Sequence, residues 1–247
     1  MSIDTQSSKP RESLWNELNW QPSPKQLQKL IQLQTLLEYW NTQTNLTRLI
    51  SGDDFWIGQV FDSLWPLKHE LNKPNEKLLC VDVGSGCGFP GLAVAIALTG
   101  SKVLLIDSVR KKTDILKQIT HELDLSTQIT ISTKRIEAIG QDSNFRGKFD
   151  LAMARAVSTA PVVSEYLIPL LHAKGEALIY KGKWNKINQE ELNKALIILN
   201  AKVSLIETKL LPGERGERNS IRLVPKGKCP AKYPRAIGLP KKYPLGH

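Results

Sequence analysis

The fold of this chain is decided by the stretch Leu78-Leu79-Cys80-Val81-Asp82-Val83-Gly84-Ser85-Gly86-Cys87-Gly88-Phe89-Pro90-Gly91. An apolar segment leads into a glycine-rich turn, and the turn leads into a predicted helix. Such a strand fills a buried parallel sheet, and glycine lets the backbone approach a ligand closely. A dinucleotide-binding loop reads G-x-G-x-x-G, but Phe89 stands where its third glycine belongs. A P-loop is excluded because no Gly-Lys-Ser/Thr follows.

The spacing of Asp82 and the three glycines indicates a nucleoside ligand other than a dinucleotide. The pattern D-x-G-x-G-x-G, made by Asp82, Gly84, Gly86 and Gly88, resembles the S-adenosylmethionine (SAM) loop of class I methyltransferases. We expect these four residues at the cofactor, with Asp82 ordering the loop or accepting a hydrogen bond from the cofactor ammonium. The alternative is a plain tight turn.

Strands and helices alternate from Lys77 onward, which predicts a parallel sheet covered on both faces. The last two strands lack a helix between them and are expected to pair as an antiparallel hairpin with a charged loop. We therefore predict an α/β fold of the class I SAM-dependent methyltransferase type, Rossmann-like, with a mostly parallel seven-stranded sheet and an antiparallel edge hairpin. The predicted strands are 77–82, 102–107, 128–132, 149–154, 176–181, 203–210 and 220–224, and the predicted helices are 89–99, 110–124, 160–171 and 186–200.

The regions on either side of this alternation differ in composition. We expect an N-terminal helical extension over residues 1–72, the methyltransferase domain over 73–224 and a basic, Pro-rich tail over 225–247. Residues 1–22 are expected to be irregular. Ser23-Pro24 predicts the start of an amphipathic helix, and a second helix is expected from Asp53 toward Leu64. The tail is expected to run extended over the surface.

Charge favours an anionic partner. The chain carries 34 Lys and Arg against 24 Asp and Glu, a net charge of +10. The segment from Pro225 to His247 is basic and holds no acidic residue. Such a segment suits a polyanion, although a merely solvated tail is the alternative.

Metal sites and membrane segments are not expected. Only 3 Cys are present, without a C-x-x-C pair, and the 4 His are scattered, which argues against a disulfide framework, a zinc site or another metal cluster. Residues Met1 to Arg11 lack the apolar core of a signal peptide, and no apolar run reaches the ~20 residues that cross a bilayer. We expect a cytoplasmic protein.

Ligands of open α/β sheets bind beyond the carboxyl ends of the strands, so residues at these ends are the candidates for the cofactor site. Asp107 ends the second strand at the spacing of a ribose-binding carboxylate, and helix capping is its alternative role. Glu137 is expected to accept from the adenine amino group; the alternative is an exposed charge. The neighbours Ser108, Val109 and Ile136 are expected to border the adenosine.

The fourth and fifth strands end in basic residues. Arg155 is a candidate for gripping the cofactor carboxylate or an RNA phosphate, and a structural salt bridge is its alternative. Lys181 is expected at the pocket rim, where it is either an RNA contact or an ordinary solvated lysine.

Taken together, these features resemble the ribosomal RNA small subunit methyltransferase G family, also called glucose-inhibited division protein B. Many members carry a histidine shortly before the Asp-Ser-Leu triplet, whereas this chain has Gln59 there. The resemblance is carried by Trp40-Asn41, Asn45-Leu46-Thr47, Asp62-Ser63-Leu64, Asp82 to Gly91, Asp107 to Lys112, Arg155-Ala156, Lys181-Gly182, Tyr233-Pro234-Arg235 and Pro240-Lys241-Lys242.

The resemblance implies a cytoplasmic enzyme that uses SAM to methylate N7 of a guanosine in 16S ribosomal RNA of the small subunit. It implies cofactor contacts at Gly84, Phe89, Ile136, Glu137 and Arg155. RNA contact is expected from the C-terminal tail, from the loop before the last strand and from the rim of the pocket. The candidates are Lys181, Arg215, Arg218, Lys226, Lys228, Arg235, Lys241 and Lys242.

This chemistry needs no acid or base, because guanine N7 carries a lone pair and no proton. We therefore expect positioning residues only, with Arg155 the one possible catalytic contributor. We hypothesise that Asp62 reads the Watson–Crick edge of the guanine, with a structural hydrogen bond as its alternative role. The competing functions are a methyltransferase for small molecules or proteins and a non-catalytic nucleotide-binding RNA scaffold.

Overall fold

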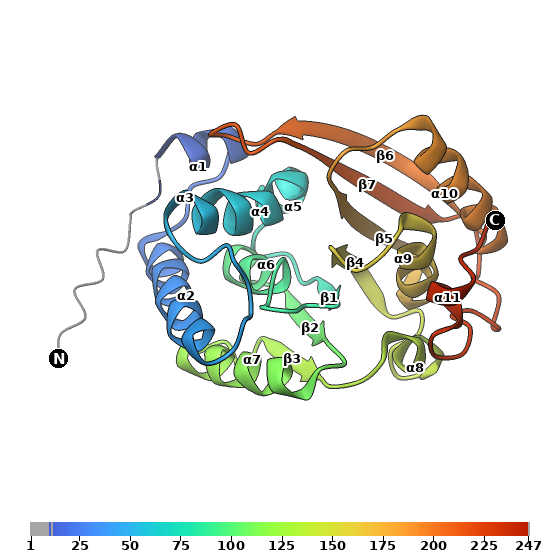
Figure 1. Ribbon diagram of the computed structural model, residues 1–247, viewed down its shortest axis with the longest axis horizontal. Helices are drawn as coiled ribbons and strands as arrows, with labels where there is room; N and C mark the ends of the chain where they lie inside the picture. Colours follow the sequence, from blue (N-terminus) through green and yellow to red (C-terminus); the bar gives the residue numbers. More distant parts are fainter. Residues whose placement is uncertain (1–9, 11, 247) are drawn as a thin grey trace.

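The computed structural model describes Pro10 and residues 12–246. Its centre is a seven-stranded sheet in the order β3-β2-β1-β4-β5-β7-β6 (Figure 1). β7 runs antiparallel to both of its neighbours, and the other pairs are parallel, which confirms the predicted α/β sheet with an antiparallel hairpin. The strands are β1 Leu79–Val83, β2 Lys102–Ile106, β3 Ile129–Ser132, β4 Phe149–Arg155, β5 Leu171–Lys181, β6 Ala201–Leu210 and β7 Glu217–Pro225.

Helices cover both faces of the sheet. Successive strand residues point to opposite faces, so Val103 and Leu105 enter one hydrophobic cluster while Leu104 and Ile106 enter the other. The first cluster is covered by the N-terminal helices with α6 Gly91–Ala97 and α7 Arg110–Glu122; the second is covered by α8 Ile136–Gln141, α9 Ala160–Leu167 and α10 Lys186–Ile198 (Figure 1).

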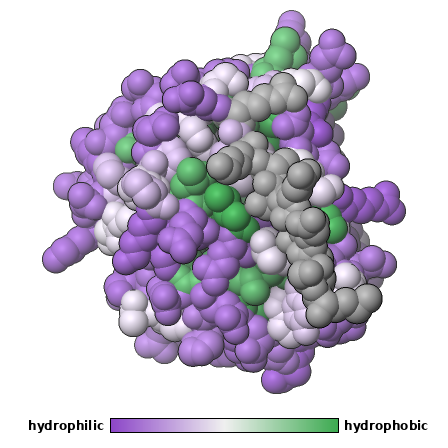
Figure 2. Space-filling model, turned by 90° about the vertical axis from the view of Figure 1, so that its left-hand side faces the viewer, coloured by the Kyte–Doolittle hydropathy of each residue, from purple (hydrophilic) through white to green (hydrophobic). Residues whose placement is uncertain are grey.

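The N-terminal region begins with α1 Glu12–Leu18 and α2 Pro24–Gln43. Ser23 caps α2 through a capping box with Gln26, which confirms the predicted helix start. The prediction of an irregular segment over 1–22 is wrong for α1, whose apolar side chains are fixed by burial against the rest of the protein. Figure 2 shows a mainly hydrophilic surface on the side of the molecule where α1 and α2 lie, with a small hydrophobic area near its middle.

The second predicted helix exists but changes its winding. It starts as α3 Gly52–Phe55, continues as the π-helix η1 Trp56–Phe61 and returns to α4 Asp62–Leu64. The 3₁₀-helix η2 Trp65–Leu67 and α5 Lys68–Leu71 follow. The π-helix is buried throughout and packs beside the carboxyl edge of the sheet.

The largest difference from the predicted boundaries lies between α9 and β5. The predicted helix 160–171 ends at Leu167, and the 3₁₀-helix η3 Ile168–Leu170 follows, because Pro169 lacks the N–H that a longer α-helix needs. β5 therefore starts at Leu171, five residues before the predicted start at 176. The C-terminal tail does lie along the surface, but it contains turns and the short helix α11 Leu239–Lys242 instead of being extended throughout.

No helix in the described part of the chain is both long and apolar enough to cross a membrane.

A buried arginine joins the N-terminal region to the sheet. Arg222 of β7 is 8% exposed and donates two hydrogen bonds to the Glu70 carboxylate, at 2.9 and 3.0 Å. It also donates to Glu176 of β5 at 2.6 Å and to the Pro66 carbonyl at 2.7 Å.

Replacing Arg222 with Met is expected to destabilise the protein by about 3–5 kcal/mol, because the Glu70 carboxylate stays partly buried without its partner. The matched control is Lys202→Met on the edge strand β6, where an exposed side chain is expected to change stability by less than about 0.5 kcal/mol. Urea unfolding of both variants measures the difference. Equal stabilities would show that the arginine contributes nothing.

Candidate cofactor and substrate site

The glycine loop lies between β1 and α6 at the carboxyl edge of the sheet. Gly84, Gly86 and Gly88 all have positive φ, at 73°, 57° and 101°. A Cβ at Gly84 would lie 2.6 Å from Val157, and one at Gly88 would lie 2.2 Å from Leu92. Glycine is therefore required both by the backbone conformation and by the space at these two positions.

The end of β2 holds this loop in place. The N–H groups of Gly84 and Ser85 donate to the Ile106 carbonyl, at 2.8 and 3.0 Å. One Asp107 oxygen accepts from the Gly86 N–H at 3.0 Å, and the other accepts from the Val109 N–H at 2.8 Å. Because each carboxylate oxygen has two lone pairs, each keeps one for a further donor. The capping residue of α7 is Val109, so Asp107 is not its N-cap.

Asp82 orders the junction between the loop and α6. Its side chain has 0% exposure, and one oxygen accepts from the Gly91 N–H at 2.9 Å. A Cβ at Gly91 would lie 2.2 Å from Leu105 and 2.9 Å from this oxygen, so the close approach requires glycine. Burial raises the pKa of Asp82 to about 7, although the Gly91 N–H and the charge of Arg155 oppose the shift.

Two cavities open on either side of the loop and share Gly84 and Asp107. The smaller cavity has a volume of ≈ 180 Å³, and the larger has ≈ 500 Å³. Apart from the shared pair, the smaller cavity is lined by Ser108, Ile136, Val157, Ser158, Tyr166 and Lys241 among others. The larger cavity is lined by Gly86, Phe89, Gln59, Asp62, Arg155 and Tyr180 among others.

The structure brings most predicted cofactor residues to these cavities. Four line neither cavity: Asp82 and Gly88, which shape the loop, and Val109 and Glu137. Val109 is 46% exposed. Glu137 is 1% exposed, and one of its oxygens accepts from the Gly238 N–H at 3.0 Å, while the other is buried without a hydrogen-bond partner.

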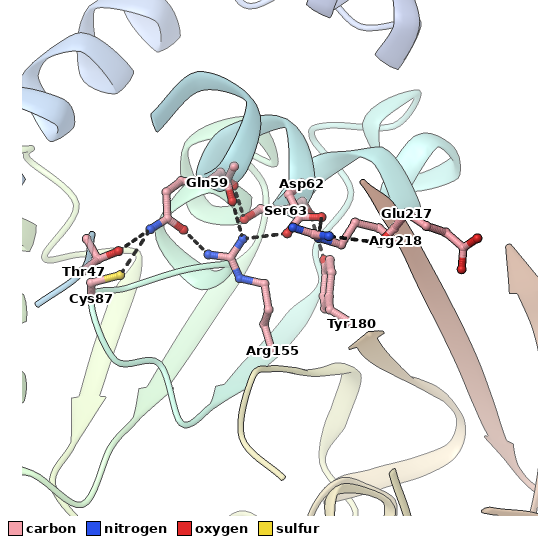
Figure 3. Close-up of polar contacts among 10 residues, drawn as sticks. Thr47, Gln59, Asp62, Ser63, Cys87, Arg155, Tyr180, Glu217 and Arg218 are labelled. Atoms are coloured by element: carbon pink, nitrogen blue, oxygen red, sulfur yellow. Dashed lines mark hydrogen bonds and ion pairs between the residues drawn. The ribbon is translucent and has the colours of Figure 1, made fainter. Parts of the chain in front are cut away.

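Arg155 joins the sheet to the N-terminal helices (Figure 3). It ends β4 and donates to the Gly58 carbonyl at 3.0 Å, to Asp62 at 3.1 Å and to the Gln59 side-chain oxygen. Its guanidinium lies 5.7 Å from the centre of the Phe89 ring. The structural salt bridge foreseen as its alternative role is thus present, and the residue also lines the larger cavity.

Gln59 is a buried residue that connects three segments of the chain. Its exposed fraction is 2%, and its amide nitrogen donates to the Thr47 hydroxyl at 3.1 Å and contacts the Cys87 sulfur at 3.7 Å (Figure 3). With its oxygen on Arg155, this single side chain ties the segment around Thr47 to the glycine loop and to β4.

The predicted RNA-contact residues separate into groups. Lys181 and Arg218 line the larger cavity and Lys241 the smaller one. Burial lowers the pKa of Lys181, which donates to the Ser158 carbonyl. Two others form ion pairs: Arg215 with Asp54 and Arg235 with Glu165.

The three remaining predicted RNA contacts line neither cavity. Lys226 and Lys228 follow β7, which is antiparallel to β5, so they lie at the edge of the sheet opposite the glycine loop. Lys242 is exposed beside the Tyr243 ring.

Some lining residues were not predicted. Val157 and Ser158 directly follow β4, so inspection of residues beyond the strand end would have found them. Tyr180 lies at the end of β5 beside the predicted Lys181, so the same inspection would have found it, whereas Tyr166 has no sequence signal because only packing brings α9 to the smaller cavity. Among the residues that the structure describes, no group of three or more His, Cys, Asp or Glu is placed to hold a metal ion.

The raised pKa of Asp82 predicts a pH dependence of stability. The folded protein binds this proton more tightly than the unfolded chain, so the stabilisation is complete below pH 3.8 and is lost as pH rises through about 7. Asp82→Asn removes the titration. The wild type is expected to lose stability relative to this variant between pH 5 and pH 8, by at most about 3 kcal/mol. Urea unfolding at both pH values measures it, and a difference independent of pH would contradict the assignment.

Comparison with known proteins agrees with the fold. The GidB family model, described as rRNA small subunit methyltransferase G, matches residues 26–219. A protein named ribosomal RNA small subunit methyltransferase G from Synechococcus sp. (strain CC9902) is 51% identical over 237 residues, 96% of this chain and 98% of that protein. Its counterpart from Prochlorococcus marinus (strain MIT 9313) is 51% identical over 246 residues, 100% of both chains.

Solved structures resemble the fold at low sequence identity. An O-methyltransferase from Bacillus cereus in complex with SAH has a TM-score of 0.56 and 15% identity, and the match covers 79% of this chain and 90% of that one. The fibrillarin pre-rRNA processing protein of Methanococcus jannaschii has a TM-score of 0.51 and 17% identity, with 63% and 69% covered. The cofactor of this fold and family is SAM, and the chain belongs to the rRNA small subunit methyltransferase G family.

Proposed function

We propose that this protein transfers the methyl group of SAM to N7 of a guanosine in the 16S RNA of the small ribosomal subunit. The observation that carries the proposal is the pair of cavities that meet at Gly84 and Asp107. One is sized and lined for a nucleoside, and the other has room for an incoming base. The family membership supports ribosomal RNA as the substrate class.

The smaller cavity fits the adenosine part of SAM. Asp107 has a free lone pair on each oxygen for the ribose hydroxyls, and the glycine backbone of the loop leaves no side chain in the way. Ser108 and Ile136 border the adenine, and the unpartnered oxygen of Glu137 is the proposed acceptor for its amino group. When bound, SAM supplies a methyl group activated by a positive sulfur.

The larger cavity fits the reacting end of the cofactor and the target base. Phe89 forms an apolar wall there, and Arg155 is the proposed partner of the cofactor carboxylate. Because Arg155 already contacts residues 58–62, its guanidinium is held in place before any ligand arrives. Preorganisation of this kind reduces the cost of ordering side chains on binding.

Methylation at guanine N7 suits a site without a general base. The nitrogen attacks through a lone pair and loses no proton, so the protein needs only to align the reacting atoms and exclude water, effects worth ~7–11 kcal/mol. The carboxylates nearest the cavities have other tasks: Asp62 pairs with Arg155, and Asp107 accepts from the loop backbone.

Guanine recognition is proposed to avoid N7 and to use the Watson–Crick edge, where an acceptor is needed. Asp62 lines the larger cavity but is 5% exposed, and its two oxygens lie 3.1 Å from Arg155 and 3.7 Å from Arg218. Its geometry favours the structural alternative, in which Asp62 holds the two arginines at the cavity wall.

The RNA backbone is proposed to cross the carboxyl edge of the sheet. Lys181 and Arg218 border the larger cavity, Lys241 borders the smaller one and Lys112 lies at the start of α7. Cations in this arrangement neutralise phosphates on both sides of an inserted base. Arg215 and Arg235 are proposed to contribute less because they are engaged in ion pairs, and Lys226, Lys228 and Lys242 because they line neither cavity. We place this reaction in the cytoplasm.

Replacing Asp107 with Asn is expected to weaken SAM binding by about 10- to 100-fold, because hydrogen bonds to a charged group contribute about 1.5–3 kcal/mol. The matched control is Asp114→Asn, on the exposed surface of α7, which is expected to bind SAM like the wild type. Calorimetric titration measures both affinities. Wild-type affinity in the Asp107 variant would remove this residue from the cofactor site.

The proposed reaction is tested by transfer of a radiolabelled methyl group to isolated small ribosomal subunits, to free 16S RNA and to large subunits as a control. Label is expected only with the first two substrates, at N7 of a single guanosine mapped by mass spectrometry. Label in protein or small molecules would support the competing methyltransferase function. Cofactor binding without transfer to any substrate would support the RNA scaffold.

A further inference from the structure

The basic C-terminal segment passes the smaller cavity on its way to α10. After β7 the chain starts at the edge of the sheet opposite the glycine loop and returns past α8 and α9 to the smaller cavity (Figure 1). Residues 229–243 cover this return path and are called the C-terminal strap below. Lys241, near its end, is one of the residues that line the smaller cavity.

One anchor of the strap is Arg146. Its guanidinium donates to the carbonyls of Cys229 and Pro230, both at 3.1 Å, and to that of Tyr233. It also donates to Gly140 of α8 at 3.0 Å. A single charged side chain of the methyltransferase domain thus satisfies three carbonyl groups of the strap.

The second anchor is an ion pair. Glu165 of α9 has 0% exposure, and its carboxylate accepts from the Arg235 side chain at 2.6, 2.9 and 3.2 Å and from the Arg235 backbone N–H at 2.8 Å. Without the strap this carboxylate would lose its only ion-pair partner among the residues that the structure describes. The strap is therefore docked by matched charge and is not a free basic arm.

Close packing accompanies these anchors. A Cβ at Gly140 would lie 2.6 Å from the Pro234 ring, so α8 has glycine where the strap crosses it. Gln141 donates to the Pro234 carbonyl at 2.6 Å, and Tyr233 is 6% exposed.

The strap also touches the residue proposed to bind adenine. The Gly238 N–H donates to one oxygen of Glu137 at 3.0 Å, and the second oxygen of that carboxylate is buried without a partner. Glu137 therefore joins the strap to the start of α8, where its neighbours Arg135 and Ile136 line the smaller cavity. Arg135 and Tyr166 donate to the same oxygen at 3.3 and 3.5 Å, so moving the strap removes the shortest of three hydrogen bonds that hold the Glu137 side chain.

We propose that the C-terminal strap is a wall of the nucleoside part of the cofactor site, so that docking of the strap and binding of SAM strengthen each other. The inference rests on the proposed adenosine position in the smaller cavity. Coupling between two binding events is reciprocal: bound nucleoside stabilises the docked strap by the same factor by which the docked strap raises nucleoside affinity.

The first test uses Arg235→Gln, which removes the ion pair with Glu165, and Lys232→Gln, which removes the same charge from an exposed position of the strap. S-adenosylhomocysteine is titrated calorimetrically without RNA. Arg235→Gln is expected to weaken binding at least about fivefold, the lower end of common coupling factors, and Lys232→Gln less than about twofold. Equal affinities of the two variants would overturn the proposal. Loss of any positive charge from the strap would then have the same effect as loss of the ion pair with Glu165.

The second test uses the wild-type protein and remains decisive if Arg235→Gln fails to fold. Hydrogen exchange of residues 229–243 is followed with and without S-adenosylhomocysteine. Slower exchange in the strap upon binding is expected, and unchanged exchange would overturn the coupling. If the wild type does not bind S-adenosylhomocysteine at all, the cofactor assignment fails instead, which keeps the two failures distinct.

Discussion

The hydrogen bond between the Gly86 N–H and the Asp107 carboxylate joins the ends of β1 and β2, and the site is built around this link. It holds a loop whose positive φ values only glycine adopts without strain. It also fixes the Asp107 carboxylate where it lines both cavities, with lone pairs left for a ligand. Gly86 and Asp107 follow adjacent parallel strands, so the sheet fixes their relative positions. The hydrogen bond between them therefore forms without a bound cofactor.

A second constraint comes from the N-terminal helices, which complete the larger cavity. Arg155 gathers acceptors from residues 58–62, and Gln59 extends the contact to Thr47 and Cys87. The segments around Thr47 and Asp62, on which the resemblance to the family rests, thus meet at one wall of the larger cavity. In the proposed function, the core sheet supplies the cofactor loop, and the helical extension supplies the surface that a target base would meet.

Charge is distributed less simply than the composition indicates. The excess of Lys and Arg is concentrated in the C-terminal tail, yet Arg235 is paired with the buried Glu165, and Lys226 and Lys228 lie at the edge opposite the loop. Two residues from elsewhere, Lys181 and Arg218, border the larger cavity. A net positive charge favours an anionic partner, but its location on the surface follows from the fold.

The sequence by itself determined the strands of the sheet, the glycine loop and the residues that follow the strands. These features follow from local patterns, namely apolar segments, turn residues and the spacing between Gly84 and Asp107. It also correctly placed the capped start of α2 at Ser23. It missed α1 and placed the boundary between α9 and β5 incorrectly, since burial and a single proline decide these ends.

Only the tertiary structure decided the partners of the charged residues. Asp62 with Arg155, Glu165 with Arg235 and Glu137 with the Gly238 N–H join positions 93, 70 and 101 residues apart in the chain. No local pattern encodes such pairs, because they form where separate elements pack together. For the same reason the tail, which by sequence is a basic extension, becomes by structure a docked part of the protein beside its cofactor site.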